Sequence, residues 1–233
     1  MATIQLTWLG HAAFRFDTPG GKRVYVDPFL DNPNCPDGEK EPARIDLIAL
    51  THGHDDHVGS TIGLVQTFGC QVATPVVELG GWLTTKGVPE DKVTAFNKGG
   101  TVDIDGVKVT STNAHHSSSA FENGTFLYLG EPAGLVFDAG GPKLYFAGDT
   151  CVFGDMKIIG DLYQPDVAIV PIGDHYTMGP VEAALAVDLL GVKRCVPCHY
   201  GTFPVLRGTP DELRALVRGV EVLSPEPGET IEL

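Results

Sequence analysis

Short apolar runs separated by glycine and proline turns fill the first two thirds of the chain. The β-type runs lie at 4–9, 13–17, 23–26 and 45–51. The run at 45–51 is almost continuously apolar, which is typical of a strand buried on both faces. An Asp105-Gly106 pair inside the alternating segment 102–109 predicts a hairpin. Further β-type runs at 126–129, 134–138 and 143–147 predict that an antiparallel meander continues from it.

The last third of the chain changes to alternation of strands and helices. A strand at 167–172, a helix at 180–190 ended by Gly191 and a strand at 194–197 form a βαβ pattern. Thr209, Pro210 and Glu212 have the spacing of a helix cap, a first helical position and a capping box. Strands fill the first two thirds of the chain, and strands alternate with helices in the last third. This order favours a mixed-sheet α/β sandwich over a doubly wound fold. No composition shift marks a boundary, so we expect a single domain, 1–233.

Composition and charge exclude some classes of binding partner. The 233 residues include 30 acidic and 16 basic side chains, for a net charge of −14, and no Lys/Arg cluster exceeds two residues. Nucleic-acid binding needs a basic face, so a DNA or RNA partner is disfavoured. No secretory leader pattern and no apolar run of ~18 residues is visible, so we expect no membrane partner and a cytoplasmic location. The sequence does not show whether the chain forms a homo-oligomer.

The strongest chemical signal follows directly after the apolar strand at 45–51. Four of the six residues of this segment can bind a divalent metal: His52-Gly53-His54-Asp55-Asp56-His57. In extended chain His52 and His54 point to the same side, and Asp56 and His57 follow where the chain must turn. The segment therefore predicts two neighbouring ligand sets, as a two-metal site requires. Zn²⁺ suits these ligands best, with Mn²⁺, Ni²⁺ or Fe²⁺ as alternatives. A solvated loop, or core histidines with hydrogen-bond partners, is the competing interpretation.

Residues 51–57 match the Thr-His-x-His-x-Asp-His motif, and the chain in this respect resembles the metallo-β-lactamase superfamily. A later histidine in 113–118, an Asp at a strand end and a late histidine follow in the order typical of that superfamily. The resemblance implies a four-layer αββα sandwich of two mixed β-sheets flanked by helices. It also implies that one metal is held by His52, His54 and His116, a second by Asp56, His57 and His199, and that Asp149 bridges them.

Two neighbouring histidines, His115 and His116, compete for one ligand position. They face opposite sides of an extended strand, so only one can bind the metal. Motif similarity favours His116. Asp149 stands where true β-lactamases have Cys, and His54 where flavodiiron proteins have Glu. Antibiotic hydrolysis and oxygen reduction are therefore disfavoured.

A Cys-x-x-Cys-His segment, Cys195 to His199, is also the attachment pattern of c-type haem. On a strand Cys195 and Cys198 face opposite sides, which suits neither a disulfide nor paired zinc ligation. We therefore interpret both as small apolar residues.

Three weaker segments, at 9–11, 26–29 and 171–180, resemble a branch of bacterial and archaeal metal-dependent hydrolases similar to ascorbate-6-phosphate lactonase. His11 and Asp27 each end a predicted strand, so we expect them to contact the metal ligands or the substrate. Asp174 and His175 carry the same hypothesis, although each can equally serve as a turn or cap before the helix at 180.

These predictions combine into one function. Two divalent ions lower the pKa of a shared water toward 7, which supplies a hydroxide nucleophile held by Asp56 and Asp149. The centre is positively charged although the chain is acidic. We therefore expect a dinuclear metal-dependent hydrolase acting on a small anionic ester, lactone or phosphoester. Phosphodiesterase activity, nuclease action included, and a non-catalytic metal-binding role are the alternatives.

Overall fold

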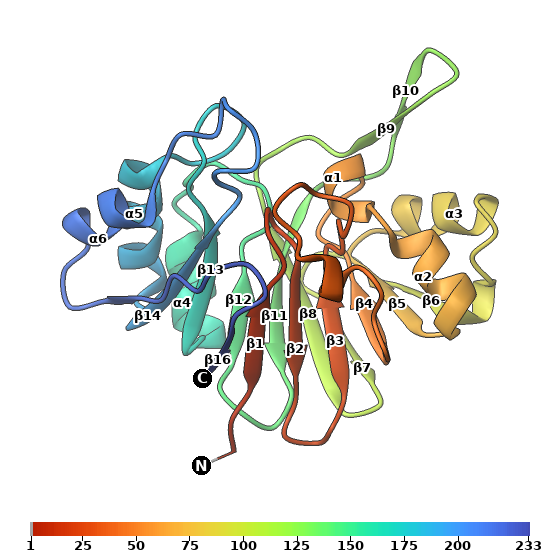
Figure 1. Ribbon diagram of the computed structural model, residues 1–233, viewed down its shortest axis with the longest axis horizontal. Coiled ribbons are helices and arrows are strands. Elements are labelled where there is room, and N and C mark those ends of the chain that lie inside the picture. The colour runs from red at the N-terminus through yellow and green to blue at the C-terminus, as the bar shows by residue number, and fades with distance from the viewer. Residues whose placement is uncertain (1) are drawn as a thin grey trace.

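Two seven-stranded β-sheets lie face to face at the centre of the computed structural model, which describes residues 2–233 (Figure 1). The first sheet, in spatial order, contains β16 (Thr230–Glu232), β1 (Gln5–Trp8), β2 (Phe14–Asp17), β3 (Arg23–Val26), β4 (Leu47–Ala49), β5 (Gln71–Thr74) and β6 (Val93–Ala95). The second contains β15 (Glu221–Val222), β14 (Arg194–Cys198), β13 (Val167–Pro171), β12 (Leu144–Phe146), β11 (Ala133–Asp138), β8 (Val107–Asn113) and β7 (Thr101–Ile104).

Helices cover the outer face of each sheet. The first sheet is covered by α2 (Thr61–Phe68) and α3 (Val77–Thr85), while α1 (Asp55–Val58) is a single turn directly after β4. The second sheet is covered by α4 (Met156–Tyr163), α5 (Pro180–Leu190) and α6 (Pro210–Leu216). Two short 3₁₀ turns lie in loops, at Asp37–Glu39 and Glu90–Lys92. No helix of residues 2–233 is long and apolar enough to cross a membrane.

The period-2 pattern of the strands explains the layers. In β3, Val24 and Val26 point into the core between the sheets, whereas Tyr25 points outward under α2 and α3. In the second sheet, Phe146 belongs to the central core and Tyr145 to the core under the helices. Both faces of both sheets are thus buried. The predicted four-layer αββα sandwich is confirmed.

The direction of the parallel strands brings the loops that follow them to one edge of each sheet. β3, β4, β5 and β6 are parallel, as are β12, β13, β14 and β15. Carboxyl ends of parallel strands meet at the same edge of a sheet, and ligands bind there in open α/β folds. The two sheets place these edges together at the top of Figure 1.

One part of the predicted meander is wrong. The hairpin around Asp105-Gly106 forms as β7–β8, and β8, β11 and β12 continue antiparallel as expected. The run at 126–129 does not join them: β10 (Thr125–Tyr128) pairs with β9 (Ser119–Glu122) in a separate two-stranded sheet that projects above the body (Figure 1). Every residue of β10 is exposed, so its apolar pattern does not reflect burial in the core.

The predicted capping box at α6 is confirmed. Thr209 accepts a hydrogen bond from the Glu212 backbone amide, and the Glu212 carboxylate accepts one from the Thr209 amide. Thr209→Ala is expected to lower the free energy of unfolding by about 1 kcal/mol, because it leaves a helix donor without its partner. Urea unfolding measures this change, and Thr209→Ser should retain most of the stability. An equal loss in both variants would contradict a capping role.

Candidate metal centre

Seven candidate ligands come together where strands of the two sheets end. His52 and His54 follow β4, and Asp56 and His57 lie in α1. His116 follows β8, Asp149 follows β12 and His199 follows β14. Close chain crossings require glycine here: Gly148 has a φ of +62°, and a Cβ on it would lie 2.9 Å from the Thr51 Cβ. The side chains thus gather because the strand ends do.

The first ligand set consists of His52, His54 and His116. The His52 Nε2 lies 3.0 Å from the His54 Nδ1, and all three residues offer ring nitrogens within 4.8 Å of one another. His115 instead is exposed and stacks on Phe153, with ring centroids 4.7 Å apart. The structure therefore turns His116 toward the cluster and His115 away from it, as the alternation of side chains predicts.

The second set surrounds Asp149. Its Oδ2 lies 3.1 Å from the His199 Nε2, 3.3 Å from the His57 Nε2 and 3.6 Å from the His116 Nε2. The Asp56 Oδ2 lies 4.0 Å from the His199 Nε2. Because Asp149 approaches histidines of both sets, its position suits a bridging carboxylate.

Several buried polar atoms of this cluster have no hydrogen-bond partner among residues 2–233. They are the His57 Nε2, the Asp149 Oδ1 and both ring nitrogens of His199. An unpartnered buried polar atom costs roughly 1–3 kcal/mol. Imidazole nitrogens and carboxylate oxygens that converge in this way fit divalent-metal binding.

The electrostatics of the cluster also favour a bound cation. Burial opposes a charge on His57, but the Asp149 and Asp27 carboxylates overcome this and hold its pKa well above the usual value. Burial raises the pKa of Asp149, yet His199 and His57 hold it well below its usual value. Burial keeps the pKa of His52 low, so its ring is neutral and able to coordinate. The buried carboxylates thus create a site for positive charge.

Asp27, at the end of β3, orients two of the neighbouring residues. Its carboxylate accepts hydrogen bonds from the Thr51 amide (2.8 Å), the Thr51 hydroxyl (2.6 Å) and the His57 Nδ1 (2.8 Å). The His57 Nε2 is consequently turned toward Asp149. Such partners fix ligand orientation and tautomer.

Asp27→Asn is expected to weaken Zn²⁺ affinity about 10–100-fold while the fold is retained, because the amide cannot reproduce the charge or all three accepted bonds. Zinc titration against a competing chelator measures this change. Asp55→Asn is the matched control, since Asp55 is exposed and belongs to neither ligand set. Equal effects of both substitutions would contradict an orienting role for Asp27.

His11 lies closer to the ligands than the sequence alone indicates. Its Nε2 lies 3.0 Å from the Asp56 Oδ2 and its Nδ1 3.0 Å from the Thr202 Oγ1. The ring is fully buried and can hold Asp56 in place. Sequence reasoning missed Thr202 and the Ser117 hydroxyl, which lies 3.3 Å from the His54 Nε2. Ser117 directly follows His116 and Thr202 lies three residues after His199, and this closeness in sequence is the only signal that could have indicated them.

Asp174 and His175, which the sequence suggests as substrate-contacting residues, lie apart from the candidate ligands. Asp174 and His175 lie exposed in the turn before α5, and their side chains make no hydrogen bond to the candidate ligands within residues 2–233. Their role toward substrate stays a prediction.

Cys195 lies in the core under the helices and Cys198 in the core between the sheets, so they face opposite sides as expected. Burial raises the pKa of Cys195 to about 12, and both thiols are free.

The backbone of the site is unusual. His11, Asp27 and His199 have φ values of 53°, 45° and 55°, in the left-handed region that non-glycine residues rarely adopt. Such conformations persist where the surrounding structure enforces them, commonly at functional sites. Here they direct three side chains inward just as their strands end.

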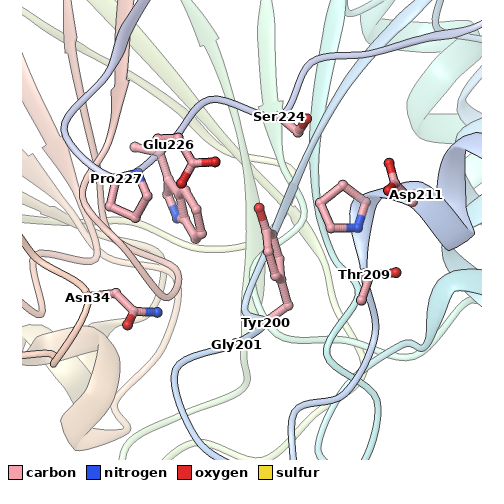
Figure 2. Close-up of a pocket in the computed structure, with 10 residues that line it drawn as sticks. Asn34, Tyr200, Gly201, Thr209, Asp211, Ser224, Glu226 and Pro227 are labelled. Carbon is pink, nitrogen blue, oxygen red and sulfur yellow. The ribbon is translucent and has the colours of Figure 1, made fainter.

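A cavity of about 420 Å³ is lined by Tyr200 and Gly201, which directly follow His199 (Figure 2). Trp8 and Tyr200 form part of its wall, stacked with ring centroids 5.0 Å apart. The Trp8 indole donates a hydrogen bond to the His11 carbonyl, which also accepts one from the His199 amide. The aromatic pair therefore supports the two chain segments that carry His11 and His199.

Comparison with known proteins gives the family. A family model described as a β-lactamase superfamily domain matches residues 22–200. The chain belongs to this superfamily. The resemblance predicted from residues 51–57 is thus confirmed, while the similarity to ascorbate-6-phosphate lactonase stays a prediction.

Relatives within the superfamily match over their whole length. A metal-dependent hydrolase of Herpetosiphon aurantiacus is 48% identical over 98% of both chains, and one of Roseiflexus is 44% identical over 99% of this chain and 100% of its own. Igni18, a metallo hydrolase from Ignicoccus hospitalis, has a solved structure that aligns with a TM-score of 0.89 at 34% identity, covering 99% of this chain and 98% of its own. The prediction of a metal-dependent hydrolase is confirmed at this level.

Proposed function

We propose that this superfamily member is a dinuclear metal-dependent hydrolase of a small, anionic ester, lactone or phosphoester. The observation that carries the proposal is the convergence of unpartnered buried atoms of His57, Asp149 and His199 next to the trio of His52, His54 and His116. One metal would be held by that trio and the other by Asp56, His57 and His199, with Asp149 between them.

Asp149, His11 and Asp27 have separate roles in the proposed centre. When bound, a pair of divalent ions lowers the pKa of water and polarises the scissile group. Asp149 supplies negative charge between the two ligand sets. His11 keeps the Asp56 carboxylate directed at the second set, and Asp27 keeps the His57 Nε2 directed at Asp149. Two dications exceed the charge of these carboxylates, so an anionic substrate is attracted locally.

Metal counting and turnover test the proposal separately. Protein loaded with excess Zn²⁺ or Mn²⁺ and desalted should retain two equivalents by elemental analysis. It should hydrolyse at least one of γ-butyrolactone, 4-nitrophenyl acetate and methyl 4-nitrophenyl phosphate. A chelator should abolish turnover, and added metal should restore it. Retention of one equivalent or less after loading would overturn the proposed dinuclear centre.

Asp56→Asn is expected to abolish hydrolysis while the protein stays folded. The amide loses the charge that the second ligand set needs, and Asp56 is part-exposed, so the fold depends little on it. Circular dichroism and metal content should accompany the assay. Full activity in this variant would show that the ligand assignment is wrong.

A further inference from the structure

We propose that one face of the hairpin β9–β10, formed by Phe121, Phe126 and Tyr128, binds an apolar group of the substrate while the scissile bond lies at the metal centre. The inference rests on the proposed hydrolase function and deepens it, because it assigns an alkyl or aryl substituent to the substrate. Below, these three residues are called the aromatic face.

The hairpin has two different faces. Strand register pairs Phe121 with Phe126 and Ala120 with Leu127, so alternate residues point to opposite sides. Ala120 is only 3% exposed and packs into the core under α2 and α3. On the other side Phe121, Phe126 and Tyr128 are 59%, 72% and 63% exposed. The aromatic face is therefore an apolar surface without a partner in the described chain.

The hairpin is anchored to the body at its strands and its base. Glu122 accepts a hydrogen bond from the Trp82 indole at 2.8 Å and pairs with the Lys86 ammonium. The Ser118 hydroxyl accepts a hydrogen bond from the Gly53 amide at 3.1 Å, inside the metal-binding motif. These contacts fix the aromatic face relative to the metal centre, as a specificity surface requires.

A pocket of about 430 Å³ runs from this face to a candidate ligand. Its wall includes Phe126 and Tyr128 of the aromatic face together with His116 and Ser117. The volume falls in the range of small-molecule sites, roughly 300–1,000 Å³. A phenyl ring or a chain of several carbons on the aromatic face would therefore have its polar end beside His116.

The solvent-exposed side of the candidate metal centre borders the pocket. His54, Asp56 and His116 retain solvent contact, whereas the remaining four candidate ligands are buried. The Ser117 hydroxyl contacts the His54 ring, so the open rim and the pocket share a border. This continuity favours the enzyme's own substrate as the occupant of the pocket.

The hydrophobic effect favours binding of an apolar group to the aromatic face. Large apolar patches are rare on soluble proteins and mark binding surfaces. Removing apolar area from water is favourable, and one extra methylene in an apolar pocket changes selectivity by about 10–200-fold. Two rings beside the centre can thus discriminate strongly between substrates that share a scissile bond.

The test compares matched substrates in the metal-loaded enzyme. The pairs are γ-butyrolactone with γ-decalactone, 4-nitrophenyl acetate with its octanoate, and methyl with phenyl 4-nitrophenyl phosphate. In whichever class is hydrolysed, wild type should have the higher kcat/KM for the apolar member. Phe126→Ala should reduce that preference about tenfold, Tyr128→Ala should also reduce it, and Phe126→Leu should largely restore it. Val181→Ala is the control, because Val181 is 72% exposed on α5.

A binding measurement adds a readout that is independent of turnover. By calorimetry, octanoate should bind metal-free wild type more tightly than acetate does, and Phe126→Ala should remove the difference. If wild type hydrolyses both members but Phe126→Ala leaves their ratio unchanged, the inference is overturned while the proposed function stands. A change in oligomeric state with unchanged selectivity would also overturn it, because the face would then join copies of the chain. No hydrolysis in any class would overturn the proposed function itself.

Discussion

His57→Ala is expected to reduce hydrolysis at least about 10³-fold and to leave the protein with one retained metal equivalent instead of two. His57 is fully buried and contacts the carboxylates of Asp27 and Asp149. Its removal leaves both carboxylates without this partner, so metal-free protein should also lose about 3–5 kcal/mol of unfolding free energy. Elemental analysis, turnover and thermal unfolding measure the three effects.

The neighbouring histidines supply the control for this result. His115→Ala should leave metal content and turnover within about twofold of wild type, since its ring is exposed and stacks on Phe153. His116→Ala should instead lose metal from the first ligand set. Should His57→Ala fail to fold, His57→Gln keeps most of the volume and still tests metal retention. Two retained equivalents in either His57 variant would contradict the assignment.

Phe137→Ala is expected to lower the free energy of unfolding by about 3–5 kcal/mol, equivalent to a fall in Tm of about 10 °C. Phe137 is fully buried between the sheets, and its ring packs edge-on against Phe16 at 5.1 Å and Phe146 at 5.4 Å between centroids. Truncation would leave a cavity between two rigid sheets that cannot close it. Urea unfolding and calorimetry measure the loss.

Phe121→Ala is the matched control, because the same atoms are removed from a ring that is 59% exposed. Its effect on the free energy of unfolding should be within about 0.5 kcal/mol. Comparable losses in both variants would show that the central core does not depend on Phe137 in the way its packing indicates.

Most of the architecture could be predicted because it depends on local patterns. The βαβ units of the last third have long periodic segments and clear helix ends, such as Gly191 and the box at Thr209. The run at 126–129 is misplaced because a short apolar run looks the same whether its strand joins the central sheet or a projecting hairpin. An apolar run therefore favours a strand, and it does not decide whether that strand is buried.

The chemistry of the candidate site and its order along the chain could be predicted from short segments. Four potential metal ligands in residues 52–57 favour a metal site over a solvated loop. The alternation of an extended chain indicates that only one of His115 and His116 can be a ligand, and motif similarity favours His116. These are properties of neighbouring residues, so local geometry suffices to derive them.

The three-dimensional arrangement was needed to establish which candidate ligand each distant supporting group contacts. The Asp27 carboxylate on His57, the Thr202 hydroxyl on His11 and the aromatic face beside His116 each join segments far apart in the chain. Such contacts depend on how two sheets are stacked and where their strand ends meet. That arrangement follows from burying both faces of each sheet at once, a condition of the whole chain that no short stretch of residues contains.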